Sequence, residues 1–225
     1  MKFLALFLLL LASCAPTSTD RVIIETSRPA SRRGRGHHFH VRVTATPVTI
    51  RHDLALKEIA RLPGAAGSGL KTQGLTTLKH SLATHTRFST TNGTREVYAW
   101  FDDVILEVSI SSDIIHIPKE YPRGSCEYEA VLQHERGHGR VARDKAVELA
   151  GNLENALATT EGLPTRFDPV ISADFASAAE RLKQAVAKVT DPVYDQYEKD
   201  EKRAQAALDR PDPYDAVYKR CTGWR

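Results

Sequence analysis

Residues 128–143 read YEAVLQHERGHGRVAR and contain a pentad of the form HExxH, in which His134, Glu135 and His138 are the defining residues. Apolar side chains recur on both sides of the pentad, as they do in one long, amphipathic and largely buried helix. Residues four apart on a helix lie on the same face, so the two histidines can present ring nitrogens to a single zinc ion. The stretch therefore predicts a long helix that carries a metal site.

Glu135 lies one position round this helix, so we expect its side chain to lie beside the metal ion without binding it. From there its carboxylate can take a proton from a zinc-bound water and deliver it to the leaving amine. Burying two histidines and a glutamate without partners is costly, which argues against the alternative that a solvated helix face carries them by accident. The pentad predicts a zinc hydrolase of peptide bonds with Glu135 as the general base.

The segments before the pentad predict a small sheet. Residues 40–46 alternate in polarity like a strand, residues 86–89 and 95–101 flank an Asn-Gly turn signal, and residues 104–110 and 114–117 read as two further strands. This order resembles the zincin metallopeptidases and implies an α+β, zincin-like fold, with a small, mainly antiparallel sheet packed on the long HExxH helix. An edge strand pairs with extended substrate in that fold, and we expect residues 114–117, or the strand before them, to be that edge.

A second long helical region is expected over residues 172–208, with an interruption at Asp191-Pro192. A catalytic zinc ion normally has three protein ligands. The sequence contains no histidine after His138, so any downstream third ligand has to be a carboxylate. Asp144 is the nearest attractive carboxylate, but it points away from the histidines unless the helix breaks at Gly139.

Two groups of residues, far apart in the chain, together form a larger sequence motif. They are Cys126, Tyr128, His134, Glu135, Gly137 and His138 in the first group, and Tyr194 and Asp195 in the second. Over roughly residues 40–225 the chain resembles a bacterial family of predicted secreted zinc-dependent proteases. That family pairs a Cys-x-Tyr…HExGH helix with a downstream Tyr-Asp-x-x-Thr-x-His segment. The resemblance implies a zincin-like metallopeptidase.

The resemblance also implies a third ligand. Asp200 stands where the family has its last histidine, and it is the expected third zinc ligand because a carboxylate is competent in that role. The other carboxylates that stay open are Asp144, Asp195, Glu198 and Glu201. Tyr194, or else Tyr197, is the expected hydrogen-bond donor to the oxyanion of the tetrahedral intermediate, with core packing as the alternative role.

The first residues predict export. The apolar run over residues 3–12 is too short to span a bilayer permanently and is typical of a secretory signal peptide. The sequence LASC, ending at Cys14, resembles the bacterial lipobox, and Ala15 after it implies an outer-membrane lipoprotein facing the periplasm or the cell surface. We expect a signal peptide over residues 1–14, a tether over residues 15–38, and the metallopeptidase domain over residues 39–225. A soluble secreted protein is the alternative.

Two cysteines remain once Cys14 is set aside. In an oxidising compartment Cys126 and Cys221 predict a disulfide. The net charge of +3 is weak, so no nucleic-acid partner is expected. The expected partners are a peptide or protein substrate and, through lipidated Cys14, a membrane. The alternative function is that of a non-catalytic envelope lipoprotein with a structural zinc site or none.

Overall fold

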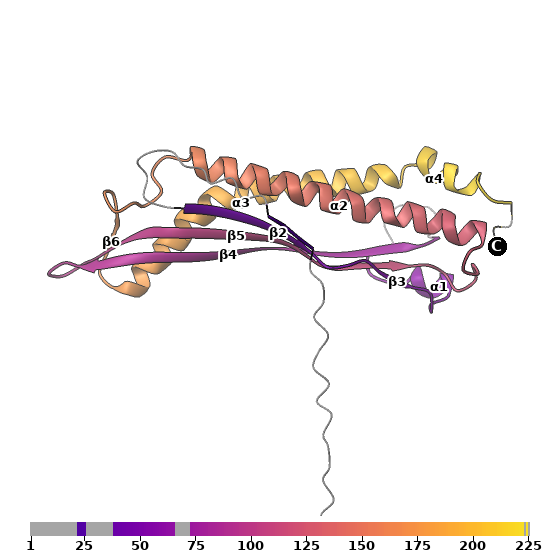
Figure 1. Ribbon diagram of the computed structural model, residues 1–225, viewed down its shortest axis with the longest axis horizontal. Helices are drawn as coiled ribbons and strands as arrows, with labels where there is room; N and C mark the ends of the chain where they lie inside the picture. The colour runs from indigo at the N-terminus through magenta and orange to yellow at the C-terminus, as the bar shows by residue number, and fades with distance from the viewer. Residues whose placement is uncertain (1–21, 26–37, 66–72, 223, 225) are drawn as a thin grey trace, which may run out of the picture.

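The fold is given by a computed structural model, which describes residues 22–25, 38–65, 73–222 and 224. It is an α+β fold, in which a long sheet lies along two long helices that run side by side (Figure 1). In chain order the elements are β1 (Val22–Glu25), β2 (His38–Ala45), β3 (Thr49–Arg51), α1 (Leu56–Ile59), β4 (Leu75–Asn92), β5 (Val97–His116), α2 (Cys126–Thr159), β6 (Val170–Ser172), α3 (Phe175–Leu208) and α4 (Pro211–Tyr218).

The spine of the sheet is the hairpin of β4 and β5, whose strands pair along their whole length. The hairpin predicted around the Asn-Gly turn is therefore confirmed. The two strands expected at residues 104–110 and 114–117 are one continuous strand, because the polar residues between them stay in the sheet. Asp113 is buried there, and one of its carboxylate oxygens accepts a hydrogen bond from Arg143 of α2 at 2.6 Å.

The sheet is mixed, with parallel pairings that the sequence does not predict. β2 and β3 pair with β5 in parallel, whereas the other pairs of strands are antiparallel. Ile114 pairs with Thr49 of β3 on one side and with Thr77 of β4 on the other, and residues 104–110 lie in the same way between β2 and β4. The prediction that either segment is a free edge is wrong. Within the described residues β4 pairs with β5 alone, so β4 is a free edge.

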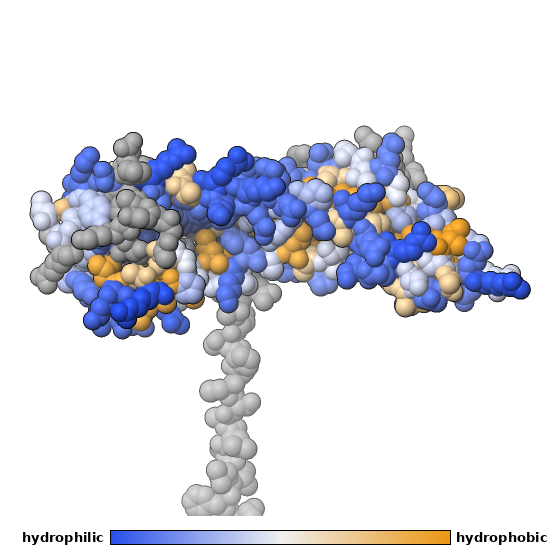
Figure 2. Space-filling model, turned by 180° about the vertical axis from the view of Figure 1, so that it is seen from behind, coloured by the Kyte–Doolittle hydropathy of each residue, from blue (hydrophilic) through white to orange (hydrophobic). Residues whose placement is uncertain are grey.

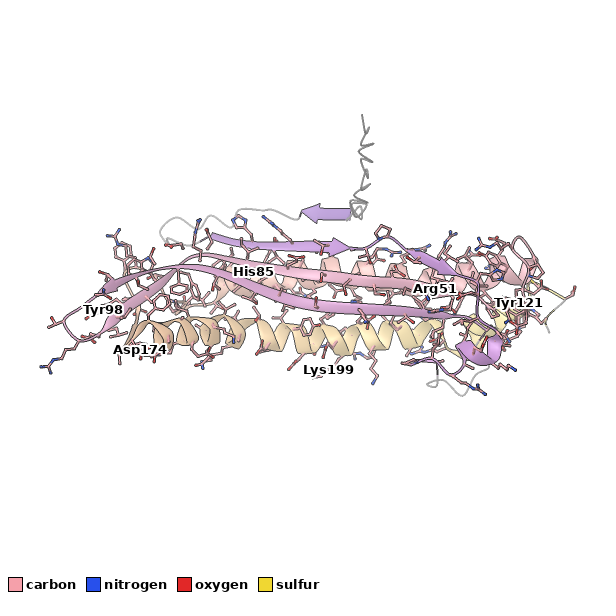
Figure 3. The ribbon with its side chains drawn as sticks, turned by 90° about the horizontal axis from the view of Figure 1, so that it is seen from below. Arg51, His85, Tyr98, Tyr121, Asp174 and Lys199 are labelled. Carbon is pink, nitrogen blue, oxygen red and sulfur yellow. A yellow bond between two sulfur atoms is a disulfide. The ribbon has the colours of Figure 1, made fainter. Side chains whose placement is uncertain are left out.

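Both long helices cover the same face of the sheet. In Figure 3 the strands lie in front of α2 and α3, and Tyr98 and Tyr121 mark the two ends of the elongated molecule. Between sheet and helices lies an apolar core; its most deeply buried side chains include Phe101, Leu106, Ile110, Leu149, Leu153 and Leu182. The face seen in Figure 2 is mostly hydrophilic, with separate apolar patches. The sheet and the core hold α2 and α3 in a definite register.

α3 does not break where the sequence predicts it. The helix runs from Phe175 to Leu208 with Pro192 inside it. Proline removes one backbone hydrogen bond and crowds the carbonyl group four residues earlier. Pro192 and Lys188 are both exposed, so water can solvate the carbonyl group that Pro192 leaves without its helical partner. The uninterrupted helix carries its C-terminal end back to the first turns of α2 (Figure 1).

The C-terminal segment is tied to the start of α2. The sulfur atoms of Cys126 and Cys221 lie at bonding distance, 2.01 Å, which confirms the predicted disulfide. At the other end of the chain, Val22–Glu25 pairs with β2 and so extends the sheet into the stretch expected to be a tether. The expected signal peptide and lipobox lie outside the described residues. Within the described segments, none of the helices has the length and apolar character needed to span a bilayer.

Candidate metal centre

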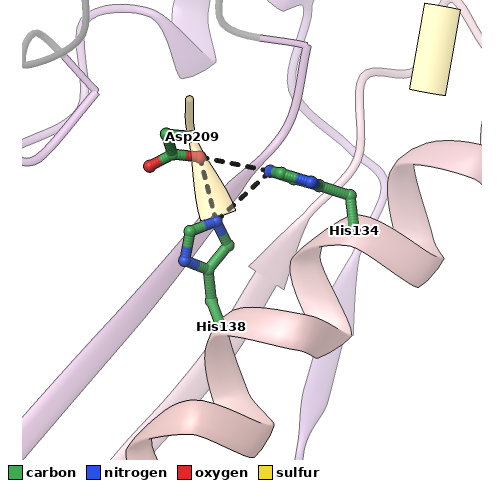
Figure 4. A group of neighbouring side chains, drawn as sticks. All are labelled: His134, His138 and Asp209. Atoms are coloured by element: carbon green, nitrogen blue, oxygen red, sulfur yellow. Dashed lines mark hydrogen bonds and ion pairs between the residues drawn. The ribbon is translucent and has the colours of Figure 1, made fainter. Parts of the chain in front are cut away.

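Three potential metal ligands meet near one end of the long helices. His134 and His138 lie one turn apart on α2, and Asp209 caps the C-terminal end of α3. The Nε2 atoms of the two histidines are 3.3 Å apart, and each lies 3.2 Å from Oδ1 of Asp209 (Figure 4). In the part of the chain that the structure describes, no other three His, Cys, Asp or Glu side chains converge in this way. The group can hold a metal ion.

The course of the chain explains how Asp209 reaches the histidines. Pro211 follows two residues later and occupies the first position of α4, where its fixed φ angle favours a new helix start over continuation of α3. α3 therefore ends at Leu208, directly opposite the pentad. The end of α3 packs against this turn of α2, since a Cβ atom at Gly137 would lie in ordinary van der Waals contact, 3.5 Å, with the Leu208 side chain.

Asp200 is not brought to the histidines. Its carboxylate accepts hydrogen bonds from Gln196, at 3.0 Å, and from Arg203. Asp209 lies nine residues further along the chain, which is about 13 Å along a helix at 1.5 Å per residue. The carboxylate that joins His134 and His138 is therefore that of Asp209.

The other carboxylates considered from the sequence also lie elsewhere. Asp144 is exposed, because α2 continues unbroken past Gly139. Asp195 and Glu198 are exposed on α3. Glu201 lies closer, in the wall of the cleft that leads to the histidines, but its carboxylate is engaged by Gln205 rather than by either histidine.

The two tyrosines pack against the hydrophobic core. Tyr197 is buried, and its hydroxyl group lies 3.1 Å from Nδ1 of His80. Tyr194 is partly buried at the margin of the same core, with its ring centre 5.6 Å from that of Tyr197. Neither tyrosine is among the residues that line the cleft. Their observed positions match the core-packing alternative better than the oxyanion role.

Glu135 is buried beside the three ligands. The hydroxyl group of Thr76, on β4, lies 2.8 Å from Oε2 of Glu135 and can donate a hydrogen bond to it. Burial raises the pKa of Glu135; the positive charges that His138 and His134 can carry and the hydrogen bond from Thr76 oppose this rise without cancelling it. A carboxyl group with a raised pKa next to a metal site is suited to accept and release a proton.

The metal-free ligands form an ion pair. Burial lowers the pKa of His138, but the hydrogen bond with Asp209 and the charges of Glu135 and Asp209 outweigh burial and raise that pKa to about 9. Burial raises the pKa of Asp209, but its hydrogen bonds to His134 and His138 and their charges hold it well below its usual range. At neutral pH the site without metal therefore holds a protonated His138 against an ionised Asp209.

A cleft of about 710 Å³ opens beside the ligands. One wall is the free edge strand β4, with Leu75, Leu78 and His80, and the opposite wall is the last part of α3, with Gln205 and Ala206. The cleft therefore joins the three potential ligands and Glu135 to a strand with one edge that no other described strand pairs with.

Two residues of this site could not be singled out from the sequence by a motif. Asp209 precedes Arg210-Pro211, and a proline there signals the end of a helix, which is the one cue that places Asp209 at a terminus. Thr76 follows a glycine-rich stretch and carries no signal that distinguishes it from the threonine beside it.

Comparison with known proteins gave no match to a protein-family model, to a curated protein or to a solved structure. The resemblance to secreted zinc-dependent proteases thus stays a prediction.

Proposed function

We propose that the protein is a zinc-dependent metallopeptidase of zincin-like fold. The observation that carries the proposal is the triangle of ligand atoms with sides of 3.2, 3.2 and 3.3 Å. Zinc bonds of about 2.0 to 2.1 Å in a tetrahedral site place neighbouring ligand atoms about 3.3 Å apart. Three protein ligands leave one position of a tetrahedron open, which is typical of catalytic rather than structural zinc sites.

When bound, zinc would lower the pKa of a coordinated water to about 7 and polarise the carbonyl group of the substrate. Glu135, buried beside the potential ligands, would accept the proton released there and pass it to the leaving amine. Thr76 holds the carboxylate of Glu135 by a hydrogen bond of 2.8 Å. A structural zinc site has no use for such an unliganded, buried carboxylate, so Glu135 favours an enzyme over the non-catalytic alternative.

An extended peptide fits the same site. The unpaired edge of β4 offers backbone hydrogen-bonding groups along the cleft, and a peptide added to that edge would run past Thr76 and so past Glu135. We propose β4 as the strand that binds substrate, and polypeptides in extended conformation as the substrate class. The signal-like residues 1–14, ending at Cys14, support an envelope lipoprotein that acts outside the cytoplasm.

The test combines metal content with peptidase activity on the purified chain. We expect about one zinc ion per chain and cleavage of unfolded proteins or peptides. Glu135→Gln should keep the zinc and lower the rate by a factor of about 10² to 10⁴, the usual contribution of a general base. Absence of zinc after reconstitution would overturn the proposal. Bound zinc without cleavage of any unfolded substrate would support the alternative of a structural zinc site.

A further inference from the structure

Gln205 connects the metal site to a second carboxylate. Its side-chain oxygen Oε1 lies 2.7 Å from Nδ1 of His138, on the opposite side of the ring from the Nε2 atom that faces Asp209. Its Nε2 atom donates hydrogen bonds to Oε1 of Glu201, at 2.6 Å, and to the backbone oxygen of His138, at 3.2 Å. Every polar atom of the Gln205 amide thus has a defined partner.

In the neutral form of His138, which is the form that can bind a metal ion, these contacts determine which ring nitrogen carries the hydrogen. The carboxylate of Glu201 and the carbonyl group of His138 only accept hydrogen bonds, so the NH₂ group of Gln205 has to face them. The carbonyl oxygen of Gln205 then has to face Nδ1 of His138. Since that oxygen cannot donate, Nδ1 carries the hydrogen, and the neutral ring has its free electron pair on Nε2.

Glu201 also lies close to His80 of the edge strand. Its Oε1 atom lies 3.9 Å from Nε2 of His80, and the Nδ1 atom of His80 lies 3.1 Å from the hydroxyl group of Tyr197. The side chains of Glu201 and His80 are only 17% and 20% exposed. The contacts therefore run from β4 through α3 to the metal-binding face of α2, within a mostly buried region where geometry is well defined.

We propose that Gln205 and Glu201 are positioning residues that hold His138 in the tautomer and ring orientation needed to bind the metal through Nε2. The inference rests on the proposed zinc site. Partners of this kind, which bind the second ring nitrogen of a ligand histidine, typically contribute 10- to 100-fold in metal affinity. Glu201 acts through Gln205, and neither residue touches the metal or the substrate in this role.

The experiment measures zinc affinity of the full chain by competition with a chromogenic chelator. Gln205→Met keeps the length of the side chain but removes the acceptor for Nδ1 and the donors to Glu201. Gln196→Met is a matched control, because Gln196 makes an equivalent hydrogen bond to Asp200 four residues away on the same helix. We expect a 10- to 100-fold loss of zinc affinity for Gln205→Met and a change below about two-fold for Gln196→Met.

A residue exchange separates positioning from general damage to the fold. In the double variant Glu201→Gln with Gln205→Glu, the new carboxylate at 205 can accept from Nδ1 of His138 and from the new amide at 201, while the backbone oxygen of His138 loses the weaker hydrogen bond that it accepted from Gln205 at 3.2 Å. We expect the exchange to restore zinc affinity to within about three-fold of the wild type, by re-forming the coupled pair. A merely structural role for Gln205 would leave the double variant as weak as Gln205→Met.

The outcomes distinguish this inference from the proposed function. Zinc binding by the wild type with equal affinities of Gln205→Met and Gln196→Met would overturn the positioning role and leave the metallopeptidase proposal standing. Failure of the exchange to recover affinity would also overturn it. Absence of zinc in the wild type would overturn the proposed function, and with it the inference that depends on it.

Discussion

Gly74, just before β4, approaches α2 so closely that a Cβ atom there would lie 2.9 Å from Oε1 of Glu135. The same atom would lie 2.5 Å from Cγ1 of Val131, a distance at which the Val131 side chain or one of the two segments has to shift. The absence of a side chain at position 74 thus lets the edge strand reach the proposed general base.

Gly74→Ala should therefore displace β4 or the side chains that it meets, Val131 and Glu135. Overpacking of this kind costs about 1 to 3 kcal/mol of stability, and peptide hydrolysis should fall more than zinc affinity does, because the displaced group is not a ligand. Gly151→Ala is the control: it lies in α2 with nothing within 4 Å of the added Cβ. It should leave activity unchanged and stabilise the helix by up to about 1 kcal/mol. Urea unfolding and peptidase assays check both variants. Equal stabilities of the two variants would contradict the close approach.

Asparagine substitutions at Asp209 and Asp200 provide a second pair of matched variants. Asp209→Asn replaces a charged ligand and should weaken zinc binding by about 100-fold or more, beyond what loss of an outer partner costs. Asp200→Asn removes only contacts with Gln196 and Arg203, and should change zinc affinity by less than about two-fold, since exposed pairs contribute little. Chelator competition on both variants decides between them. Loss of zinc in Asp200→Asn alone would show that the ligand implied by the family resemblance is the correct one.

The positions of Asp209 and Asp200 also show which part of the site could not be predicted from the sequence. His134, Glu135 and His138 were predictable because one helix turn sets their relative positions. Asp209 is separated from His134 by 75 residues, and its place depends on the register of α3 on α2. That register is set by core packing and by the continuation of α3 past Pro192. From the sequence, the proline predicts that the helix ends there. The group that could hold a metal ion includes a downstream carboxylate, as the sequence predicts, but this carboxylate is Asp209 rather than Asp200.

The strand pairing of the sheet was also only partly predictable from the sequence. Alternating polarity and an Asn-Gly turn predicted the hairpin, because these signals are local. The parallel pairing of β2 with β5 joins residues more than sixty positions apart, such as Val41 and Leu106, and no local pattern specifies it. The polar run before Ile114 looked like the end of a strand only because the partner of Asp113, Arg143, lies on a helix that follows later.

The disulfide should stabilise the protein, whereas the metal site should depend little on it. Cys126 and Cys221 close a loop of 95 residues, and chain-entropy theory assigns such a loop roughly 4 to 5 kcal/mol. The double variant Cys126→Ser with Cys221→Ser should lose about that much in denaturant unfolding. Its zinc affinity should fall far less than in Asp209→Asn, because contacts between α3 and α2, including that of Gln205 with His138, also hold the end of α3.

Reduction provides the control for this prediction. A thiol reductant should lower the stability of the wild type and leave the double variant unchanged, since the variant has no bond to reduce between these positions. A wild type that keeps its full stability after complete reduction would contradict the stabilising role.

The pH dependence of the metal-free protein tests the ion pair between His138 and Asp209. The pKa of His138 is raised from 6.5 to about 9, so its stabilising contribution is fully present below pH 6.5 and is lost as the pH rises through about 9. The pKa of Asp209 is lowered, so its contribution is present above the ordinary value of 3.8 and is lost on acidification. The melting temperature in the presence of a chelator should therefore decline between pH 6.5 and 9. In Asp209→Asn this decline should be much weaker.

Zinc competes with the proton on His138, so zinc affinity should rise over the same interval. A wild-type melting curve as insensitive to pH as that of Asp209→Asn would show that the pair does not form without metal.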